Sequence, residues 1–308
     1  MKIGIPRALL YYWYGFTWRT FWEEAGAEVV VSGPTERSTV AIGSKAGVDE
    51  LCLPIKIFLG HVRQIADQAD WIMIPHLIKV ETGAYLCPKF MGLPDLVYHA
   101  LPDVRDKVCV VTAGPRNIDM LQSLKGAALM VGIPERQIPK TLDVNNRLPA
   151  LYELAKSGYP RQSDLQRGRL RIGILGHPYC IYDRCFNLNV FDKLNGLDVD
   201  IFTPEMMPGN MLGIGSGRLH KELFWSLGRF QFDALEWMIG KLKVDGFIHL
   251  SPFACGPEAM IGDMLERRIK QAGLPVLKLL FEEHSGEAGM VTRLEAFIDL
   301  IHYRSRVC

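Results

Sequence analysis

The sequence predicts an α/β fold built on doubly wound, mainly parallel sheets. Short apolar runs rich in β-branched residues alternate along the chain with longer stretches in which apolar residues recur at helical spacing. Strands this apolar, separated by helices, are typical of a parallel sheet covered on both faces. The chain has 308 residues, which exceeds the usual size of one domain, so two domains of about 150 residues are expected.

The expected elements follow in chain order. Strands are expected in a first series at Lys2–Ile5, Glu28–Ser32, Trp71–Ile74 and Val108–Thr112, and in a second at Leu170–Leu175, Asp198–Phe202, Gly246–Leu250 and Val276–Leu280. Amphipathic stretches between them predict helices at Leu9–Ala25, Ile55–Asp67, Asn117–Val131, Lys221–Lys243, Glu258–Ala272 and Gly289–His302. The aromatic-rich stretch Leu223–Trp237 has the spacing of a helix that packs into a core.

The boundary between the two domains is expected near Lys156–Arg169, a polar stretch that contains glycine and proline. The halves resemble each other, since Lys-Ile-Gly-Ile at the start of the chain returns as Arg-Ile-Gly-Ile from Arg171. We therefore expect an N-terminal α/β domain at 1–160 with Cys52 and Cys87. A C-terminal α/β domain at 161–308 is expected to hold Cys180, Cys185 and Cys255. The cleft between two such domains is the default position for a site.

Composition excludes several classes of protein. Net charge is +1 and the basic residues are scattered, which argues against nucleic acid as a partner. The sequence shows no apolar run near the roughly 20 residues that a membrane helix needs, and its start is typical of a first strand rather than a signal peptide. A cytoplasmic location is expected. There the odd count of seven cysteines favours metal or redox chemistry over disulfides.

Three cysteines stand where the chain is expected to bend. Cys52, Cys87 and Cys255 each have a proline one or two residues downstream, so each is expected to precede a helix. The N-terminus of a helix favours thiolate over thiol, and thiolate binds soft metals. The pattern indicates an iron–sulfur cluster. The alternative is that these cysteines are buried as small hydrophobic residues, because no short Cys-x-x-Cys pair supports them.

The other cysteines and several polar residues have candidate functional roles, each with a structural alternative. Cys180 and Cys185 could extend the cluster site, whereas Cys109 lies mid-strand and predicts core packing, and Cys308 is terminal. Five further residues have candidate roles around a cofactor or in acid–base chemistry: Lys56, His177, Glu258, Glu283 and His284. A reduced cluster could be stabilised by the lysine, and the groups that follow the last strand could transfer protons. Solvated, buried or helix-capping roles are the alternatives.

Absent motifs narrow the chemistry further. The sequence has no Gly-x-x-x-x-Gly-Lys-Ser/Thr loop and no Gly-x-Ser-x-Gly elbow. The segment Gly213-Ile-Gly-Ser-Gly217 lacks the spacing and the preceding strand of a dinucleotide-binding loop, so it predicts a flexible loop. An ATPase of the P-loop type and a hydrolase of the elbow type are therefore not expected.

Several motifs together resemble the 2-hydroxyacyl-CoA dehydratase family, which includes double-cubane cluster proteins and activase-related proteins of anaerobes. The resemblance covers Met1 to about Leu300. It lies in Ile-Gly-Ile-Pro-Arg-Ala-Leu, Cys-Leu-Pro-Ile-Lys with Gly60-His61, Cys-Pro-Lys-Phe-Met-Gly-Leu-Pro-Asp, Gly-His-Pro-Tyr and Ser-Pro-Phe-Ala-Cys-Gly-Pro-Glu-Ala-Met. It implies tandem Rossmann-like domains with a cluster bound between them. It also implies that Cys52, Cys87 and Cys255 are the ligands of a [4Fe-4S] cube with one iron left open.

The resemblance further implies a partner and a role. An ATP-dependent activase of the ASKHA type, with its own iron–sulfur cluster, would pass a low-potential electron to this chain. The chain would then act on a small substrate, possibly an acyl-CoA, as a dehydratase or reductase component. A double cubane needs more sulfur ligands than the candidate cysteines offer, so a single cube is favoured. Family dehydratases pair two dissimilar subunits, so a homodimer or a larger complex is equally open. The alternatives are a scaffold that docks an activase and a zinc-binding module.

Overall fold

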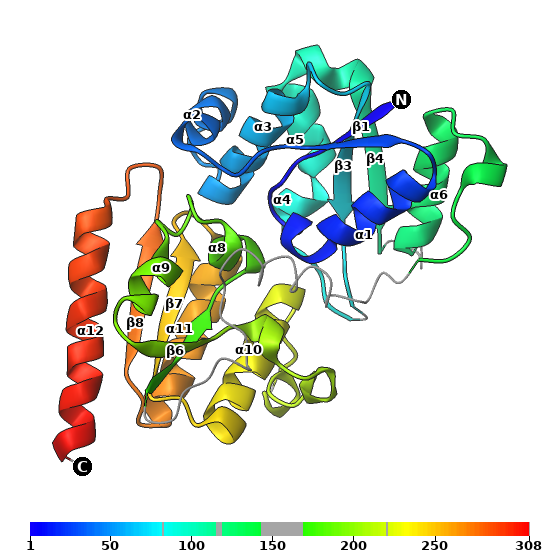
Figure 1. Ribbon diagram of the computed structural model, residues 1–308. Coiled ribbons are helices and arrows are strands. Elements are labelled where there is room, and N and C mark those ends of the chain that lie inside the picture. The colour runs from blue at the N-terminus through cyan, green and yellow to red at the C-terminus, as the bar shows by residue number, and fades with distance from the viewer. Residues whose placement is uncertain (82, 115–118, 143–168, 220, 308) are drawn as a thin grey trace. The chain divides into compact units, whose positions relative to one another are not determined.

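The computed structural model describes residues 1–81, 83–114, 119–142, 169–219 and 221–307 (Figure 1). The chain divides into two compact units. Unit 1 comprises Met1–Glu153 with the short segment Phe224–Ser226, and unit 2 comprises Leu154–Leu223 and Leu227–Cys308. The expected linker falls at Lys156–Arg169, and all of it except Arg169 lies outside the described residues.

Unit 1 contains a four-stranded parallel sheet in the order β2-β1-β3-β4. The strands are β1 (Lys2–Ile5), β2 (Glu28–Val31), β3 (Trp71–Leu77) and β4 (Val108–Ala113). The helices are α1 (Tyr11–Glu24), α2 (Arg37–Ala46), α3 (Leu53–Ile65), α4 (Pro88–Met91), α5 (Leu93–Ala100) and α6 (Met120–Met130), with 3-10 turns η1 (Pro102–Lys107) and η3 (Glu135–Gln137).

Unit 2 contains a second four-stranded parallel sheet, in the order β6-β5-β7-β8. Its strands are β5 (Leu170–Leu175), β6 (Val199–Phe202), β7 (Gly246–Pro252) and β8 (Val276–Phe281). Its helices are α8 (Pro178–Tyr182), α9 (Val190–Asn195), α10 (Ser226–Trp237), α11 (Gly256–Gln271) and α12 (Glu287–Val307), and α12 runs alongside β8 (Figure 1). The 3-10 turns η5 (Pro204–Met206), η6 (Gly209–Met211) and η7 (Ser216–Arg218) and the π-helical turn η8 (Met238–Leu242) complete it.

The two sheets share one topology. In each, the first strand of the unit lies between the second and the third, and the fourth lies outside the third. This order reverses direction between the first and third strands, which is where α/β sheets bind their ligands at the carboxyl ends of the strands. The predicted doubly wound α/β fold is confirmed, because every predicted strand is present with boundaries that differ by a few residues at most.

Helix boundaries differ more from the prediction than strand boundaries do. The helix expected at Lys221–Lys243 begins only at Ser226, and Lys243 ends the π-helical turn with a left-handed backbone (φ 53°). The helix expected at Asn117–Val131 begins at Met120, because Asp119 caps it by accepting a hydrogen bond from the Gln122 N–H at 2.7 Å. Residues 115–118 lie outside the described part of the chain.

Two glycines explain how closely α2 and α3 pack. A Cβ atom on Gly43 would collide with the carbonyl oxygen of Lys56, and a Cβ on Gly60 would collide with the carbonyl oxygen of Thr39. The helix backbones can therefore touch only because both positions lack a side chain. This contact fixes α3, the helix that Cys52 precedes.

The glycine-containing loop of unit 2 is held by one buried carboxylate. Asp233 of α10 accepts hydrogen bonds from the backbone N–H groups of Gly213, Gly215 and Ser216 at 2.7–2.9 Å. The loop predicted at this segment is present, and α10 anchors it. None of the described helices is both long and apolar enough to cross a bilayer.

Candidate functional site

The three cysteines singled out by sequence each stand immediately before a helix. Cys52 precedes α3, Cys87 precedes α4 and Cys255 precedes α11, all with extended backbone and with proline at the first or second helical position. Proline suits the first turn of a helix, where its missing N–H needs no partner, and this accounts for the helix that begins after each cysteine. The prediction that each thiol lies at the start of a helix is confirmed.

Cys52 and Cys87 lie close together in unit 1. Burial raises the pKa of both thiols, and the charge of Cys52 raises the pKa of Cys87 further. At Cys52, the ammonium of Lys89 opposes this rise in pKa through its charge and a hydrogen bond, and the backbone N–H of Ile55 opposes it as well. At Cys87, the backbone N–H of Phe90 opposes the rise. Two neighbouring thiols, one buried and one half-buried, are a donor set that suits a soft cation, because bound metal charge favours thiolate.

The remaining cysteines are distributed differently. Cys255 is half-buried in unit 2 and follows Ala254, whose backbone is left-handed (φ 60°). Cys180 is fully buried within α8, and Cys185 is half-buried, with its N–H bound to Asp183 Oδ1 at 3.0 Å. Cys109 is fully buried on β4, where burial raises its pKa to about 12, as expected for core packing. Cys308 lies outside the described residues.

Within the described ranges, no three His, Cys, Asp or Glu side chains form a group that could hold a metal ion. Cys52 and Cys87 belong to unit 1 and Cys255 belongs to unit 2. The convergence of all three on one cluster stays a prediction. The donor type and the helix-start positions fit such a group. In unit 1, the proximity of Cys52 and Cys87 fits it as well.

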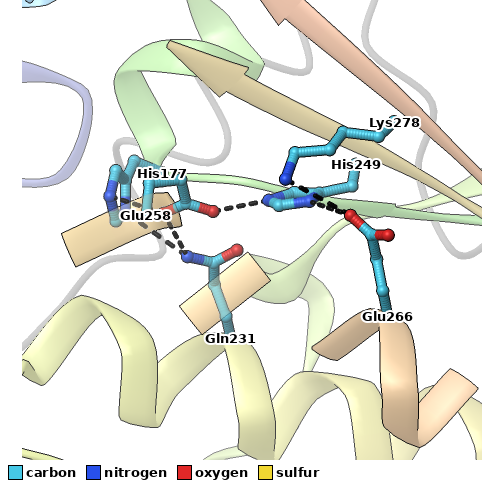
Figure 2. A network of polar contacts seen from close by, with 6 residues as sticks. All are labelled: His177, Gln231, His249, Glu258, Glu266 and Lys278. Carbon is cyan, nitrogen blue, oxygen red and sulfur yellow. Dashed lines mark hydrogen bonds and ion pairs between the residues drawn. The ribbon is translucent and has the colours of Figure 1, made fainter. Parts of the chain in front are cut away.

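Unit 2 contains a buried polar network at the carboxyl ends of its strands (Figure 2). His177 follows β5, His249 belongs to β7 and Glu258 lies in the first turn of α11. Glu258 Oε2 lies 2.7 Å from His177 Nε2, and Oε1 lies 2.5 Å from His249 Nε2. The side chains of Glu258 and His249 are fully buried, and that of His177 is 5% exposed. One carboxylate therefore joins two imidazoles.

Three further side chains complete this network. Gln231 of α10 donates from Nε2 to Glu258 Oε2 at 3.1 Å and lies 3.4 Å from His177 Nδ1. Glu266 of α11 lies on the other side of His249, with Oε1 4.0 Å from Nδ1, and Lys278 of β8 approaches the same oxygen at 3.3 Å (Figure 2). The network thus runs from the switch point between β5 and β7 towards the half-buried pair of Glu266 and Lys278.

Strand register and helix periodicity bring these residues together. His249 pairs with Lys278 on the neighbouring strand, so the two side chains share one face of the sheet. Glu258, Gly262 and Glu266 recur at intervals of one helical turn on α11 and share one face of that helix. Packing of α11 against β7 therefore places both carboxylates against His249.

The charges in the network stabilise one another. Burial opposes ionisation of Glu258, but His177 and His249 outweigh it and hold the Glu258 pKa well below its usual range. Burial would lower the pKa of His249, whereas Glu258 and Glu266 raise it. The contact with His249 and the charge of Lys278 lower the pKa of Glu266, despite its partial burial. At neutral pH these shifts favour a His249 imidazolium held between two carboxylates.

The sequence-predicted polar residues have different surroundings. His177 and Glu258 contact each other directly, which the sequence did not predict. Lys56 is buried on α3, and its Nζ donates to the Asp49 carbonyl at 3.1 Å. His284 is exposed and Glu283 half-buried in the connection between β8 and α12, and neither is part of the network of Figure 2. The roles proposed for these residues stay predictions.

Sequence reasoning missed His249, Gln231, Glu266 and Lys278. His249 does leave one signal, because it is a titratable residue in the middle of the apolar run Gly-Phe-Ile-His-Leu. A buried strand position rarely holds such a group without a charged partner. The identity of the partners could not be read from spacing, since they come from three other elements.

The fold defines a protein with two doubly wound α/β units, in which Cys52, Cys87 and Cys255 each precede a helix. Comparison with known families gives the more particular assignment. The family described as CoA enzyme activase uncharacterised domain (DUF2229) matches residues 2–207, more than half of the chain, and the chain belongs to this family. The family described as 2-hydroxyglutaryl-CoA dehydratase, D-component, matches residues 228–301, which include α11 and Cys255. No curated protein gives a significant match.

Both matches agree with the resemblance to the 2-hydroxyacyl-CoA dehydratase family at the level of the family and its activase system. They do not assign a particular member of that family.

Proposed function

We propose that this protein is an iron–sulfur component that accepts low-potential electrons from an ATP-dependent activase and passes them to a small substrate such as an acyl-CoA. The observation that carries the proposal is the shared position of Cys52, Cys87 and Cys255, each the residue before the first turn of a helix. Cysteine sulfurs presented at the starts of helices, which favour negative charge, are what an iron–sulfur cluster requires, and a bound cluster would displace the thiol protons.

The electrostatics of unit 1 supports the same proposal. Cys52 is buried and Cys87 is half-buried, and the two are close enough for the charge of one to disfavour ionisation of the other. Two such thiolates need a compensating positive charge, which a bound metal provides. Lys89 contributes a second positive charge beside Cys52 and is itself held by the Glu50 carbonyl at 3.1 Å. When bound, the cluster would supply one-electron chemistry at low potential.

The family assignments support the partner. One match is to a domain named for an activase of CoA enzymes, and the other is to a component of a CoA-dependent dehydratase. We infer an activase of the same system, with its own cluster, as the electron donor. Cys180 lies inside a short buried helix. We therefore restrict the proposed ligands to Cys52, Cys87 and Cys255 and favour a single [4Fe-4S] group over a double cubane.

Around the cluster, each residue has its own part in the proposal. Lys89 supplies positive charge near Cys52, and Lys56, on the helix that follows Cys52, is a further candidate for this role. Glu258 and His177 form the polar surroundings beyond Cys255. Glu283 and His284 are candidate proton donors to the substrate, because they follow the carboxyl end of β8. A homodimer or a complex with a second subunit would complete a dehydratase or reductase.

Anaerobic iron and sulfide analysis of the purified protein tests the ligand set. We expect on the order of four irons per chain in the wild type, and loss of most of this iron in each of Cys52→Ala, Cys87→Ala and Cys255→Ala. The matched control is Cys109→Ala, which removes a buried thiol from β4 and should retain iron. Retention of iron in all three variants, or a colourless protein with stoichiometric zinc, would contradict the proposal.

Electron acceptance needs a separate measurement. The iron-loaded protein is mixed anaerobically with a reduced ATP-dependent activase, and the broad cluster absorption near ~400 nm is followed. Bleaching that requires ATP hydrolysis supports the role as electron acceptor. Binding of the activase without bleaching would instead favour a scaffold.

A further inference from the structure

One contact in the polar network of unit 2 is longer than a hydrogen bond. His249 Nδ1 and Glu266 Oε1 are both buried and face each other at 4.0 Å, and Lys278 Nζ lies 3.3 Å from the same oxygen (Figure 2). A buried nitrogen such as Nδ1 that lacks a partner at hydrogen-bond distance is unfavourable in a folded protein. Its presence in a native fold therefore calls for a functional explanation.

The backbone of α11 lies directly against the His249 ring at Gly262. A Cβ atom on Gly262 would lie 2.5 Å from His249 Cε1, 3.3 Å from His249 Nδ1 and 3.5 Å from Lys278 Nζ. Any side chain at this position would push against the buried imidazole. Gly262 therefore lets α11 approach His249 closely, which brings Glu266, one turn further along the same helix face, beside the ring.

We propose that the contact of His249 Nδ1 with Glu266, beside Lys278, is the route by which protons exchange between solvent and His249, which makes His249 a proton store of unit 2. The outer end of the route is accessible, because Glu266 is 22% exposed and Lys278 is 31% exposed. The inner end is closed, because Glu258 occupies His249 Nε2.

The proton step is simple and balanced. The imidazolium of His249 gives the Nδ1 proton to the carboxylate of Glu266, which passes it to water, and His249 becomes neutral. Its Nε2–H bond stays intact and continues to donate to Glu258. Reloading follows the same path in reverse, with one proton taken from water.

The groups that face His249 determine how firmly the proton is held. Glu258 and Glu266 come from α11 and Lys278 from β8, while His177 of the α8 start and Gln231 of α10 act through Glu258. The two carboxylates raise the His249 pKa, so the store is loaded at neutral pH. Loss of its proton would remove the positive charge of His249 from beside Glu258.

The use of this store rests on the proposed function. Cys255 and Glu258 lie at the start of the same helix, α11. An electron added to a group held by Cys255 would place negative charge beside the network, and a loaded His249 would balance it. The proton route itself does not depend on a cluster, so it can be measured on protein without metal.

Nitrogen-15 NMR of the full-length, metal-free protein with labelled histidine tests the route. We expect the Nδ1 proton of His249 to exchange with water much faster than the backbone amides of β7. Glu266→Gln should slow this exchange at least tenfold, because the carboxylate that accepts the proton is gone. The control Asp263→Asn removes a carboxylate from the same helix, where it pairs only with exposed Arg267 at 2.9 Å, and should leave the exchange rate unchanged.

Two results would overturn the proposal. One is an Nδ1 proton in the wild type as protected as the β7 amides, and the other is an unchanged rate in Glu266→Gln. If Glu266→Gln does not fold, Lys278→Met provides the second variant and should change the rate by at least threefold. Iron content is measured on separate samples, so failure of the proton route and failure of the cluster assignment are distinguishable.

Discussion

Cys87 and Cys255 occupy equivalent positions in the two units. Each is the last residue before the helix that follows the third strand of its unit, α4 after β3 and α11 after β7. The two sheets have the same strand order, so the equivalence extends from the local bend to the topology. The weak internal echo in the sequence is thus matched by a repeated architecture.

The charge of Glu258 is expected to be essential for stability. Glu258→Gln preserves the shape of the side chain but leaves the His249 imidazolium without its nearest counter-charge in a fully buried position. Removal of one member of a buried ion pair destabilises a protein by roughly 3–5 kcal/mol. Urea unfolding should show a loss of this size. The control Glu287→Gln, which removes an exposed partner of Lys193, should change the free energy of unfolding by less than about 1 kcal/mol. Equal effects in the two variants would contradict the expectation.

His61 should make the protein less stable in mild acid. Burial, and secondarily Arg7, lower its pKa from 6.5 to about 4. Between pH 6.5 and 4 the unfolded chain binds a proton at His61 that the folded protein does not bind. The free energy of unfolding is therefore highest above pH 6.5 and falls as the pH drops towards 4. The full effect is about 3 kcal/mol, because one pKa unit corresponds to about 1.4 kcal/mol.

Replacement of His61 isolates that contribution. His61→Gln can retain a hydrogen bond to Thr35, whose hydroxyl lies 2.9 Å from His61 Nε2. The free energy of unfolding of this variant should vary less between pH 6.5 and 4 than that of the wild type. Parallel curves for the two proteins would show that His61 does not carry the pH dependence.

The close packing of α2 and α3 predicts a glycine requirement. Gly43→Ala places a methyl group against the Lys56 carbonyl and should lower the free energy of unfolding by about 2 kcal/mol or more, as overpacking does. Gly126→Ala on α6 is the matched control, since nothing lies near its added Cβ. This second change should be stabilising by about 0.5–1 kcal/mol through helix propensity. Thermal or urea unfolding of both variants checks the pair, and a destabilised Gly126→Ala would be evidence against this account.

Asp233 is expected to order the loop that contains Gly213 and Gly215. An asparagine has one acceptor oxygen and no charge, so Asp233→Asn should weaken three charge-assisted hydrogen bonds. We expect a loss of about 2 kcal/mol in stability and faster hydrogen exchange at the amides of Gly213, Gly215 and Ser216. Asp192→Asn, which removes only an exposed contact with Arg184 at 3.8 Å, should leave those amides unchanged. Unchanged protection in Asp233→Asn would rule out the anchoring role.

Much of the fold could be predicted because the signals are local. The segments around Ile72 and Ile248 are buried and apolar over the length of a strand, and such a run predicts a buried strand. The ends of the helices were less predictable. Lys243 ends a π-helical turn with a left-handed backbone. Glycine or proline is the usual sequence signal for the end of a helix, and lysine gives no such signal.

The candidate site divides in the same way. The helix-start positions of the cysteines were predictable, because proline acts on its immediate neighbours. The contact of His177 with Glu258 was not, since either residue alone is compatible with a cap or a cofactor contact.

By itself, the order of residues determined the alternation of strands and helices, the duplication and the bends at Cys52, Cys87 and Cys255, because each depends on a few adjacent side chains. Only the tertiary structure decided that His249 lies between Glu258 and Glu266 and beside Lys278. Parallel register and the packing of α11 on β7 set those distances, and neither can be read from the spacing of residues along the chain.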